Sequence, residues 1–411
     1  METRKNTELY QKLDDKLNQE FHSFCDISDY IFHHPELGGE EYESSAYLCK
    51  YLEGKGFQVS HPCQALPTAF VATYRPQKCV KQPLHIAFLA EYDALPGFGK
   101  DGGPGHACGH NWISASMCGC AVTLAAASDQ LGCQVQVIGT PAEETFGGKY
   151  DMIQDGIFDN VDFAFQAHLD EFNSIETLAL AMNSIEFTFH GVPAHAAQNP
   201  ERGVNALDAV IQMFNSVNAY RQHMGKECLI HGIITAGGTA ANTVPDFAQC
   251  KFGMRAKTKG QLRKLREQVI RIAEASELAN GAKLEYRDYE NPTDDMINTF
   301  SFADVCRKHL EDLGYENFTP EDKYPGSGSS DIGNVSYVCP TVYMEIAPKE
   351  GNPVIVHDQS AMLTVNTAAT LQTMKDVIKA YTCAAVDICL DPALQDKIKS
   401  DYNEKRKRYL E

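Results

Sequence analysis

Long apolar runs, net positive charge and internal repeats are all missing from this sequence of 411 residues. No apolar stretch approaches the roughly 18 residues that a membrane-spanning helix needs, so we expect no membrane span. Lysine and arginine number 36 against 55 aspartates and glutamates, and the resulting charge of −19 argues against nucleic acid as a partner. With 43% hydrophobic and 22% charged residues, the composition is typical of a soluble globular protein.

A secretory leader and a regular cysteine spacing are also missing, although the sequence has 14 cysteines. The first residues, METRKNTELYQKLDDKLNQEF, have the pattern of a charged helix rather than of a signal peptide. Several cysteines lie inside apolar stretches, among them Cys133, Cys250, Cys339 and Cys383. Such cysteines are typical of reduced core residues, and we therefore expect a cytoplasmic protein.

The chain is too long for one ordinary core, and two patterns of elements divide it. In the first pattern helical segments alternate with buried apolar runs, at 84–92, 134–141, 161–168 and 340–346. This alternation predicts an α/β domain with a mostly parallel sheet, formed by residues 1–182 and 291–411. Between 183 and 290 the order is βαββαβ, which is typical of a ferredoxin-like domain. We therefore predict a ferredoxin-like domain inserted into the α/β domain.

Side chains that can bind metal gather at the predicted strand ends. They occur in EYD (91–93), GHACGHN (105–111), PAEE (141–144), QAH (166–168) and IVHD (355–358). In parallel sheets the carboxyl ends of the strands meet at one edge, where functional residues collect. The stretch GHACGHN alone is compatible with a structural zinc clip, a reactive thiol, a catalytic metal centre or chance. A clip lacks its second paired motif, and a cysteine nucleophile leaves the paired glutamates without a role, whereas a metal-dependent hydrolase uses every group.

Longer motifs carry a resemblance to a known family. EYDALPGFG, GHACGHN, GTPAEETFGGKYDMI, GVPAHAAQNPERGVNALDAV and SSDIGNVSYVCPT follow one another in that order. Together they resemble the aminoacylase family of dinuclear metallopeptidases, and within it the amidohydrolase subgroup. Two departures from the common amidohydrolase pattern, Asn111 and Glu91, are similar to the branch of p-aminobenzoyl-glutamate hydrolase and the Xaa-Arg or β-alanyl-lysine dipeptidases. The glycine-rich KDGGP (100–104) is a short extra piece before the ligands.

The resemblance implies a site with two divalent metal ions, zinc or manganese. The metal ligands that it implies are Cys108, His110, Glu144, His168 and His357. It further implies that Glu143 is the general base, that Asp93 orients a histidine ligand and that His195 stabilises the oxyanion. Asn242 and Arg255 would hold the carboxylate end of the substrate. A turn cap for Asn242 and a solvated strand face for Arg255 are the ordinary alternatives.

We expect a metal-dependent amidohydrolase that cleaves the amide bond of a dipeptide or an N-acyl amino acid, with a small molecule as its substrate. Domains such as the insert often pair between subunits in the resembled family, which implies a lid or dimerisation domain and a homodimer. His195 then reaches the metal site from its own chain or from a partner. Two alternatives remain open: a catalytically silent relative that acts as a sensor or scaffold, and a thiol hydrolase that depends on Cys108.

Overall fold

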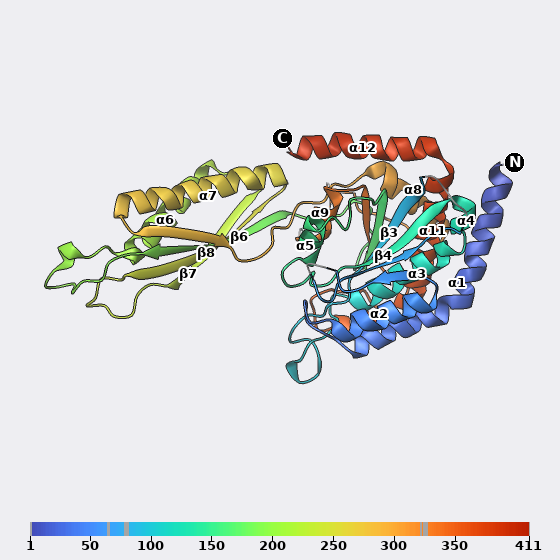
Figure 1. Cartoon of the computed structure of the whole chain (residues 1–411), viewed down its shortest axis with the longest axis horizontal. Coiled ribbons are helices and arrows are strands. Elements are labelled where there is room, and N and C mark those ends of the chain that lie inside the picture. Colours follow the sequence, from blue (N-terminus) through green and yellow to red (C-terminus); the bar gives the residue numbers. More distant parts are fainter. Residues whose placement is uncertain (1, 64–65, 78–81, 321–322, 324–327, 411) are drawn as a thin grey trace. The chain divides into compact units, whose positions relative to one another are not determined.

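The computed structural model describes residues 2–63, 66–77, 82–320, 323 and 328–410. It divides into two compact units, each with its own hydrophobic core. The larger unit comprises Met1–Leu178, Met296–Ser327 and Asp331–Arg408. The smaller unit, called the insert below, comprises Ala179–Asp295, Gly328–Ser330 and Tyr409–Glu411. Figure 1 labels the elements of both units.

A six-stranded sheet forms the centre of the larger unit, in the order β1-β2-β4-β3-β5-β10. Its strands are β1 (Gln58–Ser60), β2 (Phe70–Tyr74), β3 (Leu84–Ala90), β4 (Cys133–Gly139), β5 (Phe163–Leu169) and β10 (Thr341–Ile346). β4, β3, β5 and β10 run parallel, whereas β2 pairs antiparallel with both β1 and β4. Every residue of β5 and β10 is buried, as expected for strands covered on both faces. The predicted mostly parallel α/β fold is therefore confirmed.

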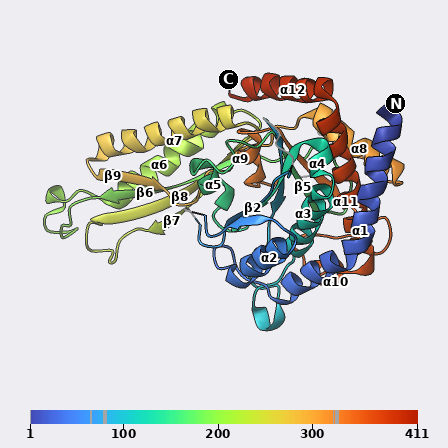
Figure 2. The same cartoon turned by 45° about the vertical axis from the view of Figure 1, so that its right-hand side comes forward.

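Helices cover this sheet. They are α1 (Glu2–His33), α2 (Tyr42–Gly54), α3 (His110–Ala125), α4 (Ser128–Leu131), α5 (Gly148–Gln154), α8 (Phe300–Asp312), α9 (Ile332–Ser336), α10 (Ala361–Thr364), α11 (Ala368–Leu390) and α12 (Pro392–Leu410), with the short 3-10 helix η1 (Lys100–Gly102). The apolar α3 is buried along its whole length, and it packs against β3, α1 and α11 (Figure 2). A Cβ atom on Gly119 would lie 2.4 Å from Ile378, so glycine permits this close helix packing.

The insert is a four-stranded antiparallel sheet with the order β7-β8-β6-β9. Its elements are β6 (Ala181–His190), η2 (Pro200–Arg202), α6 (Ala206–Tyr220), η3 (Arg221–His223), β7 (Cys228–Ala236), β8 (Phe247–Ala256), α7 (Lys259–Asn280) and β9 (Lys283–Asp288). The side chains of Asn205 and Thr258 cap the starts of α6 and α7, and both helices pack on the sheet. This is the predicted βαββαβ arrangement of a ferredoxin-like fold.

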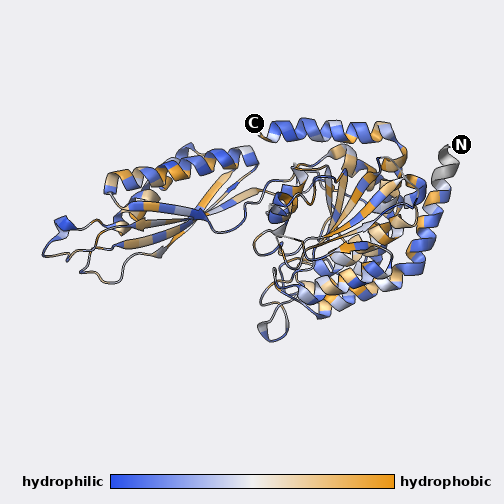
Figure 3. Cartoon of the chain, in the orientation of Figure 1, coloured by the Kyte–Doolittle hydropathy of each residue, from blue (hydrophilic) through white to orange (hydrophobic). Residues whose placement is uncertain are grey.

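Hydropathy follows these two cores, with the most apolar strands in the interior of each unit (Figure 3). The C-terminal helix α12 is mostly hydrophilic and buries only Ile398 and Tyr402. Across the described ranges, none of the helices combines the length and the apolar character needed to cross a membrane.

Candidate active site

The carboxyl ends of three parallel strands bring most of the predicted site residues together. Glu91 and Asp93 follow β3, Glu143 and Glu144 follow β4, and His168 is the penultimate residue of β5. Because these strands run parallel, their ends meet at one edge of the sheet, where functional groups of such folds gather. The sheet topology thus explains why residues far apart in the sequence share one site.

The loop before α3 supplies Cys108 and His110. Gly109 has a positive φ of 78° between them, a conformation that glycine adopts without strain, and helix α3 begins at His110. Residue His357 reaches this loop from the C-terminal part of the unit, because its backbone N–H donates to the carbonyl of Ala107 at 2.9 Å. His357 itself has a left-handed φ of 59°, which is uncommon for a non-glycine residue and typical of functional loops.

The five predicted metal ligands form two overlapping groups. The ligand atoms of Cys108, His110 and His168 all lie within 4.8 Å of one another. Those of Cys108, Glu144 and His357 form a second group within the same limit. Since the thiol of Cys108 belongs to both groups, the arrangement fits two metal ions that share one sulfur ligand.

Hydrogen bonds orient two of the histidines for metal binding. His110 Nδ1 lies 2.8 Å from Asp93 Oδ1, and His168 Nδ1 lies 2.6 Å from the carbonyl oxygen of Leu169. Each contact is made by Nδ1 and leaves Nε2 as the ligand atom, which is the usual arrangement in metal sites. The other oxygen of Asp93 accepts a hydrogen bond from the Glu144 N–H at 2.9 Å. The carboxylate of Asp93 therefore orients residues of both ligand groups.

The electrostatics of these groups call for a cation. Burial alone would lower the pKa of His110, but the carboxylates of Asp93 and Glu91 raise it to about 10. Burial would raise the pKa of Glu144, yet its hydrogen bond to His357 and the charge of His110 lower it to about 2. Acidic groups thus outnumber the bases in a buried site, and divalent cations would balance them. The donor set, one thiol, three imidazoles and one carboxylate, suits such ions.

Glu143 lies beside the ligand groups. Its carboxylate forms one group within 4.8 Å with His110 and Glu144, and another with Glu91 and Asp331. Burial and the charge of Glu91 raise the pKa of Glu143 well above its usual range. A raised pKa suits a carboxylate that accepts a proton and later returns it near neutral pH.

The thiol of Cys108 is poorly placed for a nucleophile. Burial, with the nearby carboxylates of Glu144 and Glu143, raises the pKa of this thiol well above its usual range. Reactive cysteines instead lie beside positive groups that lower the thiol pKa. The Sγ atom lies 3.3 Å from His168 Nε2, but burial and the charge of His110 lower the pKa of His168 to about 4. This environment disfavours the thiol hydrolase and favours metal ligation. His106 is also buried in the loop, as expected for a residue that supports it.

The remaining predicted residues lie in the insert. His195 and Asn242 are exposed and close together, since the N–H of Ala196 donates to the carbonyl of Asn242 at 3.0 Å. Arg255 is half-buried near the end of β8 and donates to Ser329 Oγ at 3.0 Å. The loop that holds Asn242 precedes the start of β8, so these two residues lie at opposite ends of the strand. At about 3.4 Å per residue, the strand separates them by roughly 25–30 Å.

Sequence reasoning missed two charged residues of the site, Lys149 and Asp331. Both are fully buried and form an ion pair with an N···O distance of 2.5 Å. Their only signal in the sequence was their place inside the resembling motifs GTPAEETFGGKYDMI and SSDIGNVSYVCPT.

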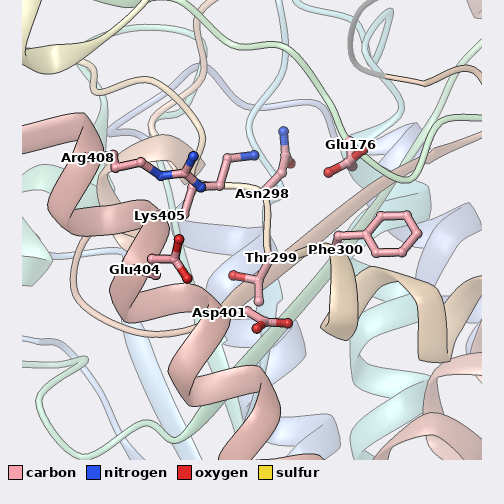
Figure 4. Close-up of a pocket in the computed structure, with 8 residues that line it drawn as sticks. All are labelled: Glu176, Asn298, Thr299, Phe300, Asp401, Glu404, Lys405 and Arg408. Atoms are coloured by element: carbon pink, nitrogen blue, oxygen red, sulfur yellow. The ribbon is translucent and has the colours of Figure 1, made fainter.

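A separate hollow of about 280 Å³ lies on the larger unit beside α12 (Figure 4). Lys405 and Arg408 of α12 face it, as do Asp401 and Glu404. Positive and negative side chains alternate around it, and no predicted site residue lines it. It is therefore distinct from the metal-ligand groups.

Comparisons with known proteins agree with this site. The model of peptidase family M20/M25/M40 matches residues 87–385. The Xaa-Arg dipeptidase of Mus musculus is 33% identical over 392 residues, which cover 92% of this chain and 88% of that protein. One of the p-aminobenzoyl-glutamate hydrolase proteins of Escherichia coli is 33% identical over 325 residues, which cover 75% of this chain and 64% of that protein.

Solved structures show the same fold. A putative aminohydrolase of methicillin-resistant Staphylococcus aureus superposes with a TM-score of 0.76 at 21% identity, covering 92% of this chain and 99% of that chain. A dinuclear metal-binding peptidase of the M20 family from Bacillus subtilis superposes with a TM-score of 0.65 at 20% identity, covering 90% and 99%. The family match and the identity to these relatives lead to one conclusion: the chain belongs to peptidase family M20/M25/M40, whose members are metal-dependent hydrolases of peptide or amide bonds.

Proposed function

We propose that this protein hydrolyses the amide bond of a dipeptide or an N-acyl amino acid, with two divalent metal ions and Glu143 as the general base. The metal ligands in this proposal are Cys108, His110, Glu144, His168 and His357, which form the two overlapping groups. The observation that carries the proposal is the shared thiol of Cys108 with Glu143 directly beside both groups. A site of this kind offers a place for water next to a base.

Each residue then has a defined step. When bound, the metal pair supplies Lewis acidity, which makes water acidic enough to react at neutral pH. Glu143 accepts the proton of the water that attacks the amide carbon, and it delivers this proton to the leaving amine. His195 donates a hydrogen bond to the developing oxyanion.

The substrate class follows from a free carboxylate next to the scissile bond. The names of the two relatives describe substrates that end in arginine or in glutamate, and both amino acids carry such a carboxylate. Arg255 suits this group because its planar guanidinium can bind a carboxylate through two parallel hydrogen bonds. Asn242 is the second predicted contact to substrate.

The metal identity in this proposal is zinc or manganese. Thiolate and imidazole ligands favour zinc, whereas carboxylate ligands also suit manganese. A reducing compartment such as the cytoplasm is part of the proposal, and the thirteen cysteines of the described ranges, all free thiols, support it.

A homodimer through the insert completes the proposal. Strand β7 lies at the edge of the insert sheet and exposes Leu229 and Ile233, with 53% and 62% of their surface accessible. An exposed apolar edge strand of this kind pairs readily with another chain. His195 and Arg255 lie at opposite ends of β8, so one substrate cannot contact both in a single insert. This separation favours a site in which the partner supplies His195.

A screen of dipeptides and N-acyl amino acids, with zinc or manganese added back to metal-free protein, tests the function. We expect turnover of substrates with a free carboxylate, loss of activity on chelation and recovery with metal. Activity that survives chelation but disappears with a thiol reagent would instead support the Cys108 hydrolase. Binding without turnover across the screen would support the silent relative.

A further inference from the structure

Behind the ligand groups lies a cluster of charged side chains that the proposed mechanism leaves unexplained. Lys149 is fully buried, and its Nζ lies 2.5 Å from Glu91 Oε1 and 2.5 Å from Asp331 Oδ1. Carboxylate oxygens of Glu91, Asp331 and Glu143 lie within 4.8 Å of one another. Three carboxylates therefore share one buried ammonium, a costly arrangement unless it serves the site.

The ammonium joins three segments that build the active site. Glu91 follows β3, Lys149 lies in the first turn of α5 and Asp331 directly precedes α9. Asp331 contacts Lys149 twice, because its second oxygen accepts the backbone N–H of Lys149 at 2.9 Å. The other oxygen of Glu91 lies 3.6 Å from His110 Nε2, so the cluster reaches the metal ligands.

Lys149 also follows a tight loop that presents Glu143. The N–H of Gly147 donates to the carbonyl of Ala142 at 2.9 Å and closes the loop. A Cβ atom on Gly148 would lie 2.2 Å from the carbonyl oxygen of Pro141, so no side chain fits there. Held at its end by Lys149, this loop has little freedom to move Glu143.

The charge of Lys149 is secure. Burial would lower its pKa, but the carboxylates of Asp331 and Glu91 raise the pKa well above its usual range. The ammonium stands where a cation bound by Glu91 and Asp331 would otherwise stand, so it occupies this carboxylate group in place of a third metal ion.

We propose that Lys149 is a positioning residue for the base: its ammonium anchors Glu91 and Asp331 and thereby fixes the carboxylate of Glu143 beside the metal-ligand groups. The inference rests on the proposed function, because it takes Glu143 as the base. It predicts that Lys149 acts on the rate of the chemical step rather than on metal or substrate binding.

The test compares Lys149→Met with Lys399→Met in the metal-loaded protein. Lys399 is the matched control, because it also forms an ion pair at 2.7 Å, with Asp162, in the same unit. We expect Lys149→Met to retain the metal content of the wild type and a KM within a few-fold of it. Its kcat per metal-loaded site should fall by about 10²-fold or more, the usual worth of a well-placed base. Lys399→Met should keep both constants.

Chemical rescue separates a positioning charge from mere structural support. Methylammonium added to Lys149→Ala should restore part of kcat with a saturable dependence on its concentration, whereas added sodium chloride should not. If Lys149→Met does not fold, the double variant Lys149→Met/Asp331→Asn, which removes the unpaired carboxylate, is measured in the same way.

Two results would overturn the inference. One is a kcat per metal-loaded site within about threefold of wild type in the lysine variants; the other is a loss of metal that fully accounts for the loss of activity. Glu143→Gln, measured in parallel, keeps the two proposals apart. An active Glu143→Gln protein would contradict the proposed function, whereas an inactive one beside a fully active Lys149→Met protein would contradict only the role of Lys149.

Discussion

At the scale of single residues, Cys108 is the most informative position of the site. Its Sγ atom belongs to both ligand groups, one with His110 and His168 and the other with Glu144 and His357. A thiol whose pKa is raised by burial and by neighbouring carboxylates becomes a thiolate only when a cation is bound beside it. A change at this residue should therefore affect both metal positions together.

We predict that Cys108→Ser loses metal more readily than it loses its fold. A serine hydroxyl is a much weaker ligand than a thiolate, so metal content after dialysis should fall below one ion per chain. Metal analysis of the purified protein, with circular dichroism as the check on folding, measures this. Cys118→Ser is the matched control, since Cys118 is also buried but lies within α3. Equal metal content in both variants would show that Cys108 is no ligand.

The sequence was sufficient for the ligand-type residues and insufficient for their charge partners. Cysteine, histidine and paired glutamates at strand ends have few ordinary roles, so their chemistry is visible in the sequence. A lysine in GGKYDM instead has the pattern of a solvated first helical turn. Its burial depends on Asp331, which lies 182 residues further along the chain, and no local pattern predicts such a contact.

At the scale of elements, burial decided which strands could be predicted. Strands β3, β4, β5 and β10 are continuous apolar runs because both faces are covered. The short β1 and β2 carry mixed residues and were not predicted. Helix α12 was missed as well, since its sequence is polar on nearly all sides and only Ile398 and Tyr402 are buried.

Glu20 on α1 gives a pH-dependent prediction for the packing of elements. It forms ion pairs with Lys16, at 2.7 Å in the same helix, and with Lys55 just after α2, at 2.6 Å. Burial would raise the pKa of Glu20, but these two lysines outweigh burial and lower it. A lowered folded-state pKa stabilises the fold above the unfolded value of about 4.3, and this stability is lost as the pH falls through the folded pKa.

Glu20→Gln should therefore lower the free energy of unfolding by up to about 1 kcal/mol at pH 7, as expected for ion pairs that remain partly exposed to solvent. The difference from wild type should shrink towards zero at and below about pH 4, where the carboxyl group is protonated in both states. Urea unfolding at several pH values with metal content held constant measures it. A difference that stays constant with pH would contradict the ion pairs as its cause.

At the scale of the whole molecule, the order of the elements was enough to predict the fold of each unit. The βαββαβ order and the alternating helices and strands have few compact solutions, so both sheets follow from the sequence. The grouping of Asn242 with Arg255 at one substrate carboxylate did not allow for the length of β8. Their positions at opposite ends of that strand could only come from the register of the folded sheet.

Mixed dimers test the role of the insert. His195→Ala alone should mainly lower kcat, by about 10²–10³-fold, with metal content unchanged. If the partner supplies His195, mixing His195→Ala with Glu143→Ala chains should restore up to about a quarter of wild-type activity, from one intact site in each mixed dimer. If His195 acts within its own chain, mixing restores nothing. Full activity of His195→Ala alone would remove the insert from the mechanism.

The turnover of metal-loaded Glu143→Gln protein is the most direct test of the central claim, that a metal-dependent hydrolysis uses Glu143 as its base. Glutamine keeps the size of the side chain but cannot accept the proton of the attacking water. The account predicts wild-type metal content, a folded protein and a kcat reduced by about 10²- to 10⁴-fold. A Glu143→Gln protein with full metal content and near-normal turnover would contradict it.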